Sequence, residues 1–202
     1  MKVEDLIAML QNARMAVFTS KDIERLTGKS ITYTSLYVSR LVARHKLIKI
    51  EKGKYCQLNA NIYEIASNIV FPSYISLFAA FSLYGLTTQG SIMTIDVLTT
   101  KRHKKISFGS YAIRFVTIDR KRLFGFQRMQ NTMIMAALPE KAIVDAVYFN
   151  DPNEAYIFEA LENGLKKKIL KADRLRDFSE KMLSRKTKDR IDFLLAEAGV
   201  NG

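Results

Sequence analysis

Apolar side chains in the first 60 residues recur at helical spacing in three successive stretches. They predict helices over residues 3–13, 21–27 and about 30–44. Gly28 is expected to end the second helix, because glycine readily takes the left-handed conformation common at helix C-termini. Only a few residues then separate the second helix from the third. This is the spacing of a helix-turn-helix.

The stretch that follows, "LIKIEKGKYCQL" at residues 47–58, changes to a strand-like pattern. It reads as two short strands around Glu51-Lys52-Gly53-Lys54, with Gly53 supplying the left-handed backbone of a tight turn. Helices followed by a β-hairpin are the order of elements in a winged helix. We therefore predict a winged helix-turn-helix domain over residues 1–60.

The remaining chain begins with helical spacing and then changes period. A short helical connector is expected over residues 59–70 and a buried helix over 73–84. The stretches "SIMTIDVLTT" and "YAIRFVTID" are rich in β-branched residues and predict strands. The segment "LFGFQRMQNTMIMAAL" predicts a further strand pair, or a strand leading into a helix.

The last third of the chain predicts helices. Pro139 stands where proline favours the first turn of a helix, and "EKAIVDAVYF" continues it. Three further helices are expected over residues 153–168, 172–183 and 187–198. Together these patterns predict an α+β protein, in which a larger mixed α/β domain with C-terminal helices covers residues 61–202.

The chain of 202 residues is strongly basic, with a net charge of +12 and a pI near 9.8. The excess is +6 over residues 1–60 and +5 over residues 61–150, but only +1 over the rest. An apolar content of 48% is that of a folded chain. The charge favours a partner that carries phosphate, such as nucleic acid.

The composition also bears on the compartment. A single cysteine, Cys56, allows no internal disulfide and fits a reducing, cytoplasmic setting. Glu4 and Asp5 interrupt the apolar core that a signal peptide would need. The most apolar stretch, residues 69–86, contains Pro72 and several serines, so we expect a buried segment and no membrane partner.

Residue patterns typical of catalysis are scarce. His45 and His103 stand alone, without cysteine or acidic residues at metal-ligand spacing, and no glycine-rich phosphate loop occurs. Cys56 is read as a small apolar residue of the core rather than a nucleophile. We therefore assign no catalytic residue, no metal and no cofactor. The acidic residues considered are read as helix-start or surface charges; they are Glu140, Asp145, Glu159, Glu162, Asp189 and Asp192.

The third predicted helix is expected to contact DNA. In a helix-turn-helix the second helix lies in the major groove, and its first residues reach base edges while later cations bind phosphates. Hydroxyls and two tyrosines stand at the start of this helix, and lysines stand at the tip of the hairpin. The predicted DNA-binding residues are Lys29, Ser30, Thr32, Tyr33, Thr34, Tyr37, Arg40, Arg44, Lys52 and Lys54.

A second basic run lies between two predicted strands of the larger domain. It reads either as a charged loop tip or as an auxiliary phosphate-binding surface. Its cations are Lys101, Arg102, Lys104 and Lys105.

Several stretches occur in the order found in one known family. "IEKGKY", "FPSYISLFAAFSLYGLTTQ", "VLTTKRHKK" and "LPEKAIVDAVYF" together make the chain resemble AbiEi-type antitoxins, the winged-helix transcriptional regulators of type IV toxin–antitoxin systems. The resemblance runs from about residue 4 to 165 and is sharpest over Pro139–Asp145. It does not include the last 35 or so residues.

The resemblance implies a function for each part of the chain. The first 60 residues would bind inverted repeats in the system's own promoter, and the larger domain would carry the antitoxin activity. The antitoxin would oppose a nucleotidyltransferase-like toxin without forming a stable complex, and would bind DNA cooperatively or as a homodimer. The basic run at 101–105 would match the family's basic surface.

Two other functions stay open at this level. A winged helix can deliver a nucleic-acid-processing enzyme to its substrate, and it can also serve as a protein-interaction module. Metal-dependent turnover would identify the enzyme, whereas a steep salt dependence of binding to duplex would separate DNA binding from protein binding.

Overall fold

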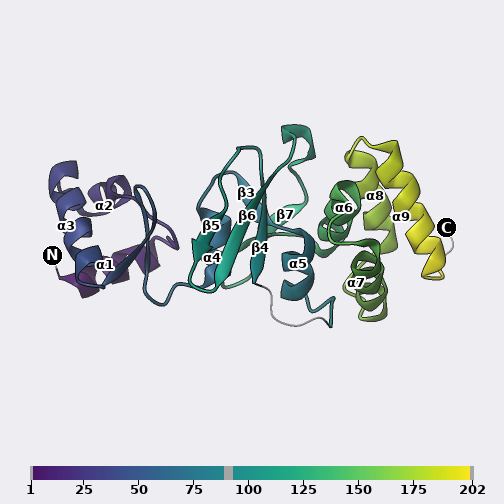
Figure 1. Cartoon of the computed structure of the whole chain (residues 1–202), viewed down its shortest axis with the longest axis horizontal. Coiled ribbons are helices and arrows are strands. Elements are labelled where there is room, and N and C mark those ends of the chain that lie inside the picture. Colours follow the sequence, from purple (N-terminus) through teal and green to yellow (C-terminus); the bar gives the residue numbers. More distant parts are fainter. Residues whose placement is uncertain (1, 89–92, 201–202) are drawn as a thin grey trace.

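The computed structural model describes residues 2–88 and 93–200. The chain is elongated and has three parts in sequence order: a small N-terminal helical part with a hairpin, a central β-sheet, and a C-terminal group of helices (Figure 1). It is an α+β protein, as predicted. Along the described ranges, no helix has both the length and the apolar character that crossing a bilayer requires.

Three helices open the chain at the predicted places. They are α1 (Val3–Asn12), α2 (Ser20–Thr27) and α3 (Ile31–Ala43). Thr19 caps α2 by accepting a hydrogen bond from the Asp22 amide, which replaces one of the partners missing at a helix start. Gly28 ends α2 in the left-handed conformation (φ 66°), so α3 begins after a turn of three residues.

The hairpin consists of β1 (Leu47–Glu51) and β2 (Lys54–Gln57), paired antiparallel. Its tip uses the positive φ of Gly53 (78°), as the sequence indicated. Phe18 adds a short third strand, because its amide and carbonyl both bond to Tyr55 of β2. The order of helices and hairpin is therefore the order predicted for a winged helix.

A small core holds these elements together. Side chains from all three helices, from the Phe18 strand and from β1 pack in one buried cluster. Its members are Leu6, Leu10, Phe18, Ile23, Val38, Leu41 and Leu47. The helical spacing of these apolar residues determines which face of each helix points inward, and hence which face of α3 points outward.

The central part is a mixed sheet of six strands in the order β5-β6-β4-β3-β8-β7. The parallel pairs are β4 with β6 and β3 with β8, and the other neighbours are antiparallel. The strands are β3 (Ser73–Ile75), β4 (Thr94–Thr99), β5 (Ile106–Phe108), β6 (Tyr111–Thr117), β7 (Phe126–Arg128) and β8 (Met135–Ala137). A short 3₁₀ helix, η1 (Arg120–Arg122), follows β6.

One predicted element is wrong. The helix expected over residues 73–84 is split into β3 and the short helix α5 (Leu77–Leu83). The connector helix is confirmed as α4 (Ile62–Asn68). Strand β3 escaped prediction because it is only three residues long and buried on both faces, which removes the alternating pattern. Of the predicted strand at 91–100, residues 91 and 92 lie outside the described ranges.

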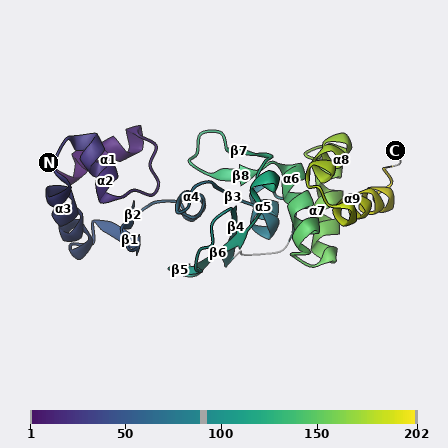
Figure 2. The ribbon, with the colours of Figure 1, turned by 90° about the horizontal axis from the view of Figure 1, so that it is seen from above.

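Both faces of the sheet are covered. Successive residues of a strand point to opposite faces, so Leu98 of β4 joins one core while its neighbour Val97 joins another. The Leu98 face is covered by the C-terminal helices, and the Val97 face by α4 and by the hairpin residues Ile48 and Cys56. The hairpin thus contributes to the core on this side of the sheet. Figure 2 shows α4 between the hairpin and the sheet.

The C-terminal helices are α6 (Pro139–Phe149), α7 (Glu154–Lys166), α8 (Ala172–Lys181) and α9 (Arg185–Glu197). All four occur where the sequence predicted them. Helix α6 is buried along most of its length, because it packs between the sheet and the other three helices (Figure 1).

A buried polar cluster fastens α6 to the sheet. Lys141 and Asp145, one turn apart on α6, form an ion pair with no exposed side-chain surface. Asp145 also accepts hydrogen bonds from Tyr74 (3.1 Å) and Ser76 (2.8 Å). Burial lowers the pKa of Lys141 and raises that of Asp145, and their mutual attraction opposes both shifts.

Removing one member of this pair should destabilise the fold strongly. Lys141→Met leaves Asp145 as an uncompensated buried carboxylate, so we expect the free energy of unfolding to fall by about 3–5 kcal/mol. Adding Asp145→Asn should recover part of that loss, because the amide keeps partners in Tyr74 and Ser76. Urea denaturation of the two single variants and the double variant measures this. Additive losses would contradict the assigned coupling.

Candidate nucleic-acid interface

The outer face of α3 is exposed and chemically mixed. Thr32, Tyr33 and Arg40 lie on it, as predicted for a helix that contacts DNA. One apolar side chain outside the predicted DNA-binding set, Leu36, is also exposed there, whereas Ile31, which is 38% exposed, lies toward the side of Val38. Leu36 is 52% exposed.

The two tyrosines of α3 differ in position. Their rings stack with centroids 6.0 Å apart. Tyr33 is exposed, whereas Tyr37 is half-buried and packs against the N-terminal core. Burial raises the pKa of Tyr37, and Tyr33 and the nearby carboxylates Glu4 and Asp5 raise it further. Tyr33 is therefore the tyrosine best placed to reach a partner, and Tyr37 supports its ring from behind.

Thr34 does not belong to this surface. Its side chain is fully buried, and its hydroxyl donates to the Ile31 carbonyl. The prediction that Thr34 contacts DNA is therefore wrong. It failed because Thr34 shares its helix face with Val38 and Leu41 of the core.

The turn before α3 is exposed and holds the helix start. Ser30 accepts a hydrogen bond from the Tyr33 amide (3.3 Å) and so caps α3, while Lys29 beside it is exposed. At the other end of the helix Arg44 is exposed, and at the hairpin tip Lys52 is exposed as well. These positions agree with phosphate-binding roles, since each side chain is free to extend.

Lys54 differs from Lys52 because it turns toward the central part of the chain. Its amine forms an ion pair with Glu51 (2.8 Å) and donates to the Ile69 carbonyl at the end of α4 (2.6 Å). With these two partners Lys54 holds the hairpin to α4. The sequence prediction of a DNA contact at Lys54 therefore does not match its position.

Glu51 joins the hairpin to the basic loop between β4 and β5. Its carboxylate lies 3.2 Å from Nε2 of His103, whose ring packs against Phe115 with centroids 4.4 Å apart. Burial alone would raise the pKa of Glu51, but Lys54 and then His103 outweigh it and hold the pKa below its ordinary value. The folded chain thus gains stability from this carboxylate at neutral pH and loses it as the pH falls through that lowered pKa.

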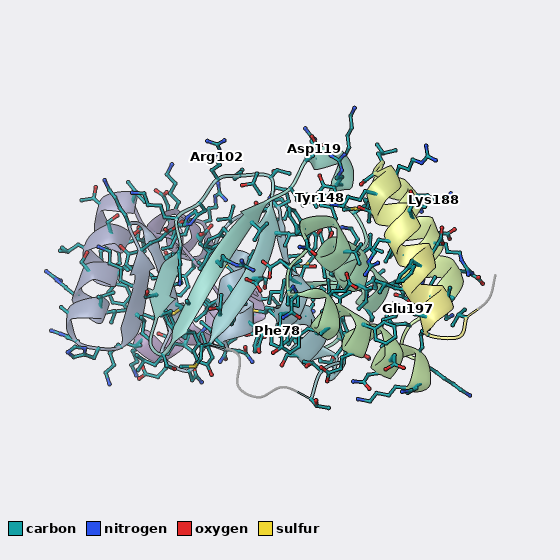
Figure 3. The ribbon with its side chains drawn as sticks, turned by 45° about the vertical axis from the view of Figure 1, so that its right-hand side comes forward. Phe78, Arg102, Asp119, Tyr148, Lys188 and Glu197 are labelled. Atoms are coloured by element: carbon teal, nitrogen blue, oxygen red, sulfur yellow. The ribbon has the colours of Figure 1, made fainter. Side chains whose placement is uncertain are left out.

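These contacts bring the two predicted basic groups together. His103 touches the hairpin, and its neighbours in the loop are exposed cations. They are Lys101, Arg102, Lys104 and Lys105. Figure 3 shows Arg102 beyond the upper ends of the strands and pointing away from the sheet, with Asp119 on the same side. The hairpin and the loop are therefore joined through Glu51 and His103, and their exposed cations, Lys52 and those of residues 101–105, are together called the junction surface here.

The acidic residues considered for catalysis have structural partners. Glu159 accepts from the Thr88 amide (2.9 Å) and hydroxyl. Glu162 pairs with Lys166, Asp189 with Arg185, and Asp192 with Arg176. Glu140 accepts from the Lys171 amide (3.1 Å) and lies 3.7 Å from Arg174. The assignment to a helix start is confirmed for Glu140, and the assignment to charge pairs for Glu162, Asp189 and Asp192. Asp145, which the sequence analysis read as a helix-start or surface charge, is instead fully buried against Lys141, because its face of α6 packs on the sheet.

A cavity of about 850 Å³ lies among α6, α7 and α9, outside every predicted site. Among the residues that line it, Arg190 pairs with Glu154, and Arg185 with Asp189. Within residues 2–88 and 93–200, no three His, Cys, Asp or Glu side chains lie close enough to hold a metal ion together.

Comparison with known proteins gives the fold alone. No protein-family model matches the chain, and no curated protein matches its sequence. Among solved structures, the chain is similar to the crystal structure of the RV2827C protein from Mycobacterium tuberculosis. The TM-score is 0.61 at 14% sequence identity, and the match covers 96% of this chain and 76% of that one. The arrangement of elements is therefore shared with a protein of very different sequence.

Cys56 should be chemically inert in the folded chain. It is fully buried, and burial raises the pKa of its thiol to about 12. Because only the thiolate attacks disulfide reagents, we expect labelling at pH 7.5 to be slower than that of the unfolded chain by at least about a hundredfold. Ellman's reagent with and without denaturant measures this, and the single cysteine makes the signal unambiguous. Equal rates would contradict the assigned burial.

Proposed function

We propose that this chain is a sequence-specific DNA-binding regulator of transcription, with α3 as the helix that enters the major groove. The observation that carries the proposal is the outer face of α3. It presents hydroxyls, the Tyr33 ring and Arg40 directly after a three-residue turn. Such a face offers hydrogen bonds to base edges, and Leu36 offers apolar contact to thymine methyl groups.

The charge distribution supports the same partner. The net charge of +12 is concentrated in the first 150 residues, which include α3 and the junction surface. Exposed lysines and arginines bind phosphate and release the counterions of DNA, so they supply affinity without reading sequence. In this proposal α3 reads bases, while Arg44, Lys52 and the loop at 101–105 hold the backbone.

The resemblance to AbiEi-type antitoxins extends the proposal. On that basis the chain represses the operon of a type IV toxin–antitoxin system by binding inverted repeats in its promoter, cooperatively or as a homodimer. The larger domain carries the antitoxin activity, opposing a nucleotidyltransferase-like toxin without a stable complex. The quoted stretches from "IEKGKY" to "LPEKAIVDAVYF" support this more specific function.

One observation favours a second candidate, a protein-interaction module. Leu36 exposes apolar surface on the helix face that would enter DNA. A protein partner would cover this side chain and would bind with little dependence on salt. The salt dependence of binding to duplex therefore separates the two functions.

The deciding experiment is fluorescence anisotropy with a labelled duplex from the region upstream of the chain's own coding sequence. A scrambled duplex is measured beside it, each at two salt concentrations. A regulator should prefer the native duplex by at least roughly a thousandfold. Weak and equal binding to both duplexes would overturn the proposal.

Each cation of the proposed interface should contribute separately to the salt dependence of DNA binding. Lys52→Ala should weaken binding to native and scrambled duplexes alike, and should reduce the slope of log K against log salt by about 1, because one phosphate contact is lost. Lys188→Ala on α9 is the matched control, since it removes an exposed lysine far from α3 (Figure 3). An unchanged slope for Lys52→Ala would remove the hairpin tip from the interface.

Tyr33 should determine sequence preference. Tyr33→Ala removes an exposed ring from the start of α3, so we expect the ratio of native to scrambled affinity to fall by about ten- to a hundredfold while scrambled binding changes little. Tyr111→Ala removes a similarly exposed ring from β6 and should leave the ratio unchanged. If Tyr33→Ala keeps wild-type discrimination, α3 is not the reading helix.

A further inference from the structure

Phe71 is the most exposed large apolar side chain among the described residues, with 82% of its surface open to solvent. It lies between α4 and β3, in a stretch whose other apolar residues are buried: Val70 before it is 7% exposed, and Tyr74 after it is fully buried. A phenylalanine ring held in water is unfavourable by the apolar area it exposes. The fold therefore holds this ring outward while it buries its neighbours.

The backbone on both sides of Phe71 is tethered. Two residues before it, the Ile69 carbonyl accepts from Lys54 of the hairpin (2.6 Å). Directly after it, the Pro72 carbonyl accepts from the Thr99 hydroxyl at the end of β4 (2.7 Å). The exposed ring thus stands on a short segment that is fastened at each end and is not a free loop tip.

Both tethers lie close in sequence to the junction surface. Lys54 follows the exposed Lys52 and Gly53 at the hairpin tip. Thr99 accepts from the Lys101 amide (3.3 Å), at the start of the basic loop. Because β3 and β4 are antiparallel, Thr99 at the end of β4 lies beside Ser73 at the start of β3. The Phe71 segment is therefore held between the hairpin, at Lys54, and the end of β4, at Thr99, where the basic loop begins.

We propose that Phe71 is a wedge that bends duplex DNA by inserting its ring between two base pairs. The inference rests on the proposed DNA-binding function and extends the interface from α3 to a second contact. An apolar side chain that enters a base step from the minor groove partly unstacks it and kinks the duplex. Lys52 on one side and Lys101 and Arg102 on the other bind the phosphates that flank the step.

The positive charge near the Phe71 segment favours DNA over a protein as the partner of this ring. Each tether of the Phe71 segment lies two residues from an exposed cation, Lys52 before Lys54 and Lys101 after Thr99, and the hairpin carboxylate Glu51 is already paired with Lys54 and His103. An apolar protein partner would have to leave these cations beside its own surface, whereas DNA offers a phosphate to each cation and a stacked base to the ring.

Bending is measured by energy transfer between dyes at the two ends of a duplex that wild-type protein binds. The wild-type protein should bend it by roughly 20–90°. Phe71→Ala should still bind the duplex, about ten- to a hundredfold more weakly, with the bend lost. Phe71→Leu should keep most of the bend, because leucine also serves as a wedge. Phe193→Ala, which removes a half-exposed ring from α9, is the matched control and should behave as wild type.

The outcomes separate this inference from the proposed function. If the wild-type protein binds and bends the duplex and Phe71→Ala bends it equally, the wedge is overturned while DNA binding stands. If the wild-type protein binds no duplex above the scrambled control, both are overturned. Sedimentation of the Phe71→Ala and wild-type proteins adds a further check. Loss of self-association with an unchanged bend would assign Phe71 to a protein contact and overturn the wedge.

Discussion

The interaction of Glu51 with Lys54 and His103 decides how the two halves of the chain work together. A hairpin of eleven residues, 47–57 with its turn, has too little core to hold its own position. Here Glu51 binds a lysine of the same hairpin and a histidine of the central part, and Cys56 buries the inner face of the hairpin against the sheet. The orientation of the N-terminal helices relative to the sheet depends on this contact.

The same contact shapes the candidate interface. Because His103 contacts Glu51 of the hairpin, the loop cations beside it lie near the hairpin. Two basic groups separated by about fifty residues of sequence are joined in this way, and the segment that carries the exposed Phe71 is tethered to the hairpin and to the end of β4. In the proposed function, α3 and the junction surface contact the same duplex.

The buried ion pair of Lys141 and Asp145 has a different purpose. Perturbed pairs of this kind often indicate catalytic sites, but here neither side chain has exposed surface, and Tyr74 and Ser76 satisfy the carboxylate. A substrate cannot reach such a pair. It orients α6 on the sheet, and α6 in turn supports the C-terminal helices. The "EKAIVD" stretch is thus explained by packing.

The sequence by itself determined most of the helices, the hairpin, the glycine end of α2, and the exposed residues Tyr33, Arg40 and Lys52. These features depend on the spacing of apolar residues and on which residues stand at turns, and both can be read from neighbouring positions in the sequence. It also indicated that Cys56 is buried. Strand β3 could not be predicted, because a three-residue strand buried on both faces has no period.

Only the tertiary structure decided which of the predicted side chains share a surface. Thr34 is buried in the core, Lys54 binds Glu51 and the Ile69 carbonyl, and Phe71, which belongs to an apolar stretch expected to be buried, is exposed. Each of these outcomes depends on partners 15 or more residues away or on packing between elements. Local sequence patterns predict which interactions a side chain can make, whereas the packing of distant segments determines which groups it contacts.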